Sequence, residues 1–223
     1  MIGIVIAMES EAAPFIKGGV KKEQTILNRK FFTVTLGKTE AIIAVSGIGK
    51  VNAAFTTGVL IDKFSPDIIL NCGVSGGIGE GLHVLDVVVV DACVQHDVDT
   101  SPLGDPKGMV STVNVTYFYT DKKYSDLFDK GFVRGTAASG EQFVASYDKK
   151  KEIAKEFNAI ICDMESGAIA QCAYIAGIPF VCLRCVSDLA DEEATMSFTE
   201  LCDIASAKIY SAVKDFAVKA NGV

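Results

Sequence analysis

The sequence has no excess of positive charge. Its 21 Lys and Arg residues are outnumbered by 28 Asp and Glu residues, so the formal net charge is −7. A surface of this sign repels polyanions, and it therefore argues against nucleic acids and anionic membranes as partners.

A membrane-spanning helix requires roughly 20 consecutive apolar residues, and the sequence contains no such run. Its most apolar later stretch, 84–94, includes Asp86 and Asp91. The apolar segment 1–8 has no basic residues before it and acidic residues directly after it, which predicts a strand and not a signal peptide. The seven cysteines are an odd number, mostly within apolar runs, which is typical of reduced, buried thiols. We therefore expect a cytoplasmic protein.

Cofactor motifs are also missing. The Gly-Lys pair at 49–50 is followed by Val51, and Ala44 stands where a phosphate-binding loop requires glycine. The segment 47–52 lacks the third glycine of a dinucleotide fingerprint. Cys182 and Cys185 have metal-site spacing, but they lie in a predicted strand, where residues three apart point to opposite faces. His96 is a lone loop histidine, so we expect no metal and no cofactor.

Short runs rich in Val, Ile and Phe predict strands at 2–8, 31–36, 41–45, 67–72, 86–94, 132–137, 159–163 and 179–186. Longer patterns with apolar residues three and four apart predict helices at 50–64, 148–157, 165–177 and 197–219. This alternation predicts an α/β fold, a three-layer αβα domain around a mixed, mostly parallel twisted sheet. No linker or repeat divides the chain, so we expect one domain over residues 1–223, with a long loop at 98–113.

Charged residues follow several predicted strands. Glu11, Glu165 and Asp188 lie at or just beyond strand ends, and such ends converge on one edge of a parallel sheet. Each acid alone could instead be a first-turn or capping residue of the following helix, but their coincidence favours acid and base chemistry. Arg184 lies within a buried strand, so we expect it to meet a carboxylate or a ligand hydroxyl.

Six segments carry a family resemblance. They are 3–11 (GIVIAMESE), 46–50 (SGIGK), 71–77 (NCGVSGG), 139–144 (SGEQFV), 163–165 (DME) and 187–191 (SDLAD). In this order and spacing they resemble the bacterial 5′-methylthioadenosine/S-adenosylhomocysteine nucleosidases, members of the nucleoside phosphorylase superfamily. The resemblance covers nearly the whole chain and implies hydrolysis of an adenine N-glycosidic bond.

The resemblance also implies catalytic roles. Glu11 would activate water, Asp188 would supply a proton to adenine N7, and Glu165 would hold the ribose hydroxyls. These roles suit the reaction, because the departing base must be protonated on one side while water attacks from the other. Three carboxylates suffice without a metal, and Ser187 is available to hydrogen-bond Asp188.

Further contacts follow from the resemblance. Phe143 would stack on adenine and the Val144 backbone would read its edge, while Met8, Ile48 and Met164 would line the sugar. Phe198 and, from a neighbouring subunit, Leu103 would complete the alkylthio pocket, which implies a homodimer.

Two positions depart from the family pattern. An aromatic residue often stands in the family where this chain has Leu103. The usual Ser-Ala-Gly-Gly is replaced by Val74, Ser75, Gly76 and a further glycine, so that one hydroxyl has moved along this substrate-binding segment.

Three other functions remain open. A purine nucleoside phosphorylase would need arginines to hold phosphate, and this chain has only Arg29, Arg134 and Arg184. An aminodeoxyfutalosine hydrolase is not separable by sequence. A nucleoside-binding protein without turnover would need neither Glu11 nor an acidic Asp188.

Overall fold

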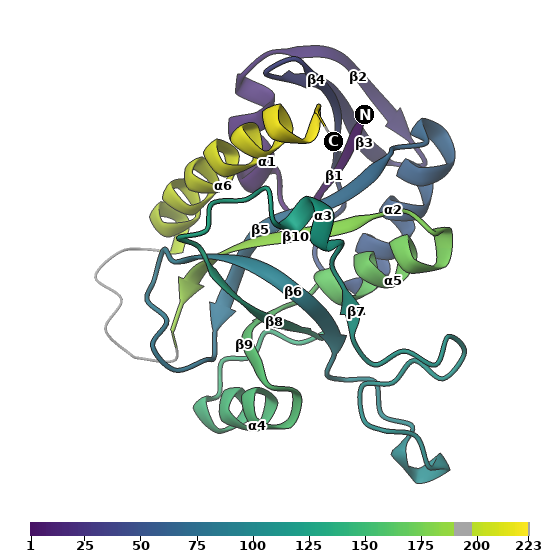
Figure 1. Ribbon diagram of the computed structural model, residues 1–223, viewed down its shortest axis with the longest axis vertical. Coiled ribbons are helices and arrows are strands. Elements are labelled where there is room, and N and C mark those ends of the chain that lie inside the picture. Colours follow the sequence, from purple (N-terminus) through teal and green to yellow (C-terminus); the bar gives the residue numbers. More distant parts are fainter. Residues whose placement is uncertain (190–197, 223) are drawn as a thin grey trace.

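The computed structural model describes residues 1–189 and 198–222 (Figure 1). Its strands are β1 (Ile2–Ile6), β2 (Val20–Ile26), β3 (Arg29–Leu36), β4 (Thr39–Val45), β5 (Ile68–Gly77), β6 (Val87–Gln95), β7 (Phe118–Tyr119), β8 (Val133–Ser139), β9 (Ala159–Asp163) and β10 (Phe180–Asp188). Its α-helices are α1 (Glu9–Lys17), α2 (Lys50–Phe64), α3 (Lys122–Ser125), α4 (Tyr147–Phe157), α5 (Ser166–Ala176) and α6 (Phe198–Ala220).

Every strand and helix predicted from the sequence is present, and the predicted mixed α/β architecture is confirmed. The sequence patterns missed α1, β2, β7 and α3. β2 is mostly exposed and polar, so it lacks the apolar alternation of a buried strand. The expected loop at 98–113 contains one 3-10 turn, Ser101–Leu103. In the described ranges 1–189 and 198–222, no helix is long and apolar enough to cross a membrane.

The strands form one mixed sheet in the order β10-β6-β8-β9-β5-β1-β4-β3-β2, with β7 beside β6. Two groups are parallel, β4-β1-β5-β10 and β6-β8-β9. Antiparallel pairs join the two groups, β10 with β6 and β5 with β9, and add β3, β2 and β7 at the edges. The ends of β5, β9 and β10 therefore lie together.

Helices cover both faces of this sheet (Figure 1). Alternate residues of β1 show the division, since Ile4 packs in the cluster formed with α1 and α6, whereas Val5 packs in the cluster formed with α2 and α5. Cys185 and Cys182 also separate in this way, one into each cluster, as their spacing in a strand predicts. Both are free, buried thiols.

Phe216 of α6 tests how much this packing contributes. Its ring is 1% exposed and stacks on Phe128 at 4.6 Å. Phe216→Ala should lower the free energy of unfolding by about 3–5 kcal/mol, because it removes buried contacts and leaves a cavity. Urea denaturation measures the change. Val218→Ala, at a position of the same helix that is 58% exposed, is the control and should change stability by less than about 0.5 kcal/mol.

Candidate active site

Glu11 is a buried carboxylate at the start of α1. Its Oε2 accepts a hydrogen bond from Met8 N at 3.0 Å, which caps the helix, and its Oε1 accepts one from Val74 N on β5 at 2.8 Å. Burial raises the pKa of Glu11 above its usual value, and the two backbone donors and Arg184 act against that rise. Glu11 is thus a first-turn helix residue that caps α1 and also points across to β5.

Gly73 allows this approach. A Cβ at Gly73 would stand 2.5 Å from Glu11 Oε1 and 2.9 Å from Arg184 Nη1. Any larger residue there would therefore displace the carboxylate or the guanidinium from its place.

Arg184 is a guanidinium buried within β10, 1% exposed. Its Nη2 lies 2.9 Å from Asp163 Oδ2 and donates to Asn71 Oδ1 at 2.7 Å, while Nη1 donates to the Val74 carbonyl at 3.2 Å. Burial opposes its charge, but the surrounding carboxylates, Asp163 first, outweigh that effect and raise the pKa of Arg184. The prediction that this arginine meets a carboxylate is confirmed.

Glu165 is also buried. Its Oε1 accepts a hydrogen bond from Gly49 N at 3.0 Å, and its Oε2 lies 3.8 Å from Arg184 Nη2. Burial, only partly offset by Arg184, raises the pKa of Glu165 to about 7. The Glu165 side chain does not cap α5. Asp163 does so instead, because its Oδ1 accepts hydrogen bonds from the backbone N–H groups of Glu165 and Ser166.

Asp188 ends β10 and faces a small cavity of about 30 Å³. The cavity is lined by Gly76, Gln142, Phe143, Val144, Cys162, Asp163, Met164 and Asp188. Asp188 Oδ2 accepts from Ser187 Oγ at 3.1 Å, and Oδ1 accepts from Lys150 Nζ at 2.8 Å. The residues expected to contact adenine and the residue expected to protonate it therefore line the same cavity.

Glu11 and Asp188 meet the same strand at different points. Glu11 binds the N–H of Val74, and Asp188 is in register with Gly76. Two residues along a strand span about 7 Å. The two acids therefore lie beside points of β5 that are separated by roughly the length of a sugar ring with its leaving base.

The remaining predicted residues are placed as follows. Met8 adjoins Glu11, and Ile48 is 53% exposed in the loop before α2. Ser75 is buried, its carbonyl accepts from Ser187 Oγ at 3.3 Å, and its own hydroxyl has no partner among the described residues. Leu103 is 85% exposed in the 3-10 turn and lines no cavity with the others.

Two predicted positions reach the undescribed segment. Phe198 is the first residue of α6, and the expected contact of its side chain lies outside the described residues. The end of the 187–191 motif, Ala190 and Asp191, also lies outside them.

Sequence reasoning missed three residues of this network. Asn71 and Asp163, although within quoted motifs, were assigned no role, yet both bind Arg184. Lys150 appeared as one of three consecutive lysines. A signal was available, because Lys150, Ile153 and Phe157 recur at spacings of three and four and share the buried face of α4.

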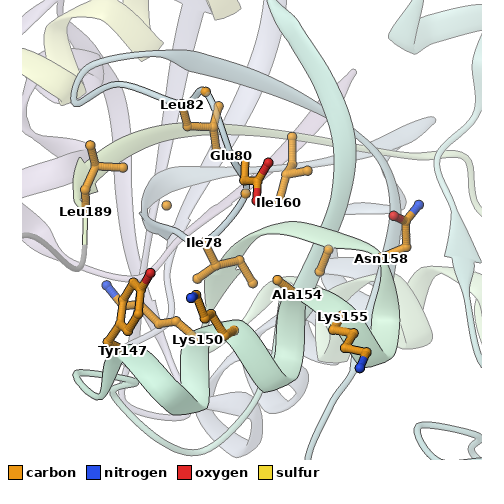
Figure 2. A pocket seen from close by; sticks show the side chains of 15 residues that line it. Ile78, Glu80, Leu82, Tyr147, Lys150, Ala154, Lys155, Asn158, Ile160 and Leu189 are labelled. Atoms are coloured by element: carbon orange, nitrogen blue, oxygen red, sulfur yellow. The ribbon is translucent and has the colours of Figure 1, made fainter.

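A larger cavity of about 750 Å³ lies between α4 and the segment that follows β5 (Figure 2). Its lining includes Ile78, Leu82, Tyr147, Lys150 and Leu189, and none of the residues expected to bind substrate. The candidate active site is therefore the place where Glu11, Glu165 and Asp188 converge, although the cavity of about 750 Å³ lies elsewhere.

Comparison with known proteins agrees with this geometry. The family model described as "Phosphorylase superfamily" matches residues 1–217. The chain belongs to the phosphorylase superfamily. A 5′-methylthioadenosine/S-adenosylhomocysteine nucleosidase of Staphylococcus aureus is 40% identical over 207 residues, which cover 89% of this chain and 90% of that protein.

Solved structures of this superfamily show the same architecture. The 5′-methylthioadenosine/S-adenosylhomocysteine nucleosidase of Streptococcus pneumoniae with the transition-state inhibitor MT-ImmA has a TM-score of 0.90 and 32% identity, covering 97% of each chain. A futalosine hydrolase of Helicobacter pylori has a TM-score of 0.90 and 31% identity, covering 98% of this chain and 97% of its own.

The raised pKa of Glu165 predicts how the stability of this protein depends on pH. The folded protein binds a proton at Glu165 up to about pH 7, whereas the unfolded chain releases it near pH 4.5. The free energy of unfolding should therefore fall as pH rises between these values, by up to about 3 kcal/mol from this group. Glu165→Gln should remove that part of the slope.

Chemical denaturation of the wild type and of Glu165→Gln at a series of pH values tests this. The control is Glu152→Gln, at an exposed carboxylate that pairs with Lys149 on α4. Equal slopes for the wild type and Glu165→Gln would contradict the prediction.

Proposed function

We propose that this protein hydrolyses the adenine N-glycosidic bond of 5′-methylthioadenosine and S-adenosylhomocysteine, releasing adenine and the 5′-thioribose. The observation that carries the proposal is that Glu11 and Asp188 lie beside two β5 residues that are two positions apart, Val74 and Gly76. A 40% identical relative bears the name of this activity, and neighbouring structures bind inhibitors of it. The whole of residues 1–223 would act as one nucleosidase domain.

Glu11 is the proposed general base. Its two backbone hydrogen bonds hold the carboxylate in one orientation, and its raised pKa makes it a stronger base than an exposed glutamate. As water attacks C1′, Glu11 accepts a proton from it, the new C1′–O bond forms and the C1′–N9 bond breaks.

Asp188 is the proposed general acid, which donates a proton to adenine N7 as the base departs. Phe143 and the Val144 backbone flank the same small cavity and would hold the ring. A space of about 30 Å³ is too small for a purine, so a purine requires Phe143 or Met164 to move outward. Phe143 is 70% exposed and is free to do so.

Glu165 would accept hydrogen bonds from the ribose hydroxyls. Arg184 supports this role, since its Nη2 lies 3.8 Å from Glu165 Oε2 and the guanidinium is held in place by Asp163 and Asn71. Met8, Ile48 and Met164 would form the apolar walls beside the sugar. Val74, Ser75 and Gly76 would present strand backbone to the nucleoside.

The arrangement of arginines favours water over phosphate as the nucleophile. Arg29 donates to Asn52 and lies over Phe55, and Arg134 pairs with Asp91. Arg184 is already paired in the interior. No arginine therefore forms a free fork for a phosphate dianion, and the Glu11 carboxylate would repel one.

Futalosine hydrolysis is the second candidate. The Helicobacter pylori neighbour named for it is as similar in structure as the nucleosidases are. Both reactions require the same base, acid and ribose contacts, and they differ at the 5′ substituent, on the side where Leu103 and Phe198 are expected to act.

Hydrolysis is tested by the release of adenine from methylthioadenosine, with and without phosphate. We expect equal rates and free methylthioribose as the product. Glu11→Gln should lower kcat by ~10²–10⁴-fold with little change in KM, because the pocket keeps its size but loses its base. Glu9→Gln, at an exposed residue of the same helix, should behave as the wild type.

Other outcomes would point elsewhere. Sugar 1-phosphate that accumulates with phosphate would identify a phosphorylase. Release of base from aminodeoxyfutalosine alone would favour the second candidate, and binding without turnover of any nucleoside would indicate a binding protein.

We also propose a cytoplasmic homodimer. Large apolar side chains are exposed on α2 and in three loops: Val51 and Phe55 on the helix, and Ile48, Leu103 and Phe143 in the loops. Val51 N donates a hydrogen bond to Glu141 Oε1 in the loop that carries Phe143, so α2 and that loop adjoin. Exposed apolar patches of this kind mark association surfaces.

Light scattering should give twice the mass of the chain. Val51→Asp places a charge where the side chain is 78% exposed, and it should weaken the dimer and adenine release together. Val218→Asp, on an exposed position of α6, is the control. A fully active monomer would contradict the proposal that a neighbour completes the pocket.

A further inference from the structure

Lys150 is a charged residue on the buried face of α4. It is 4% exposed and lies in line with Ile153 and Phe157. An ammonium group in such a position is unfavourable by several kcal/mol unless a partner of opposite charge meets it. Its neighbours in sequence do not share this position, since Lys149 pairs with exposed Glu152 and Lys151 lies over the Tyr147 ring.

The partner of Lys150 is Asp188. The Nζ–Oδ1 distance is 2.8 Å, and the Asp188 side chain is about one third exposed, towards the small cavity. Lys150 itself lines the larger cavity, where Figure 2 shows it on α4 beside Tyr147. The ion pair therefore lies between the two cavities and forms part of the wall of each.

The pair bears directly on the acid step, because it determines how the Asp188 carboxyl group is oriented. Lys150 Nζ donates to Oδ1 at 2.8 Å. Oδ2, which accepts from the neighbouring Ser187 hydroxyl at 3.1 Å, is therefore the oxygen available to a bound base.

We propose that Lys150 is a positioning residue for the acid step: it fixes the Asp188 carboxyl group through Oδ1 and thereby directs Oδ2 to the departing base. This inference rests on the proposed nucleosidase function. With Oδ1 held by Lys150, Oδ2 is the oxygen that carries the proton. The Ser187 hydroxyl can then turn to the Ser75 carbonyl, 3.3 Å away, and leave Oδ2–H for N7.

The test compares kcat and KM for adenine release by the wild type and Lys150→Met, which keeps most of the side-chain volume and removes the charge. Lys150→Met should lower kcat by about 10–100-fold with little change in KM, because a misplaced acid slows the chemical step. Lys150→Arg should restore most of the rate. Lys151→Met removes the same charge one residue along and should leave both constants as in the wild type.

A second measurement shows whether Lys150 acts through Asp188. In an Asp188→Asn background, Lys150→Met should cause no further change in the residual rate. If Lys150→Met does not fold, Lys150→Gln replaces it with the same expected loss of kcat.

The outcomes separate the two proposals. A wild type that releases adenine from no nucleoside contradicts the proposed function and this inference with it. A wild type that is active while Lys150→Met keeps the wild-type kcat, or changes KM alone, contradicts only the inference. A loss of kcat that is equally large for Lys151→Met would also overturn it, because the effect would then be one of general charge.

Discussion

The candidate site depends on the buried guanidinium of Arg184. It lies in the middle of β10, where it is 1% exposed, and it binds Asn71 and the Val74 carbonyl of β5 and Asp163 of β9. Removal of one partner from such a buried pair leaves an uncompensated charge, at a cost of about 3–5 kcal/mol. The ends of β5, β9 and β10 are consequently held together by electrostatics as well as by the backbone hydrogen bonds of the sheet. Glu11 and Glu165 lie around the guanidinium charge.

The acids of the site differ because their surroundings differ. Glu11 and Glu165 are buried, so desolvation raises the pKa of each, and backbone N–H groups from distant segments orient them. Asp188 is more exposed and is met by a lysine and a serine hydroxyl. Groups of the same chemical type can serve as base, anchor and acid when the protein gives each a separate environment.

Much of this could be predicted from the sequence, for identifiable reasons. The strands β1, β5 and β10 are rich in apolar residues and lie parallel, so parallel pairing implies that Glu11 and Asp188 converge. Glu165 follows β9, which meets the end of β5 through an antiparallel pair instead. β2 could not be found in this way, because an exposed edge strand such as Val20–Ile26 needs no apolar face. α1 contains Pro14 and is only nine residues long, which weakened its helical pattern.

The parts of the site that the sequence did not reveal are those that depend on contacts between distant segments. Nothing near Asn71 indicates that its amide oxygen will receive a guanidinium from residue 184, 113 positions away. Lys150 is similar, since three consecutive lysines are most simply read as solvated, and only the helical phase distinguishes the inward one.

That same phase has a chemical consequence. An apolar residue at position 150 could not donate to Asp188 Oδ1, whereas this chain places an ammonium group 2.8 Å from it. Lys150 follows the 139–144 segment closely on α4, so one short stretch of chain supplies both the cavity wall at Phe143 and Val144 and the group that holds the carboxyl of Asp188. Strands β5, β9 and β10 bring the reacting groups together, and the inward face of the helix packed against them orients one of those groups.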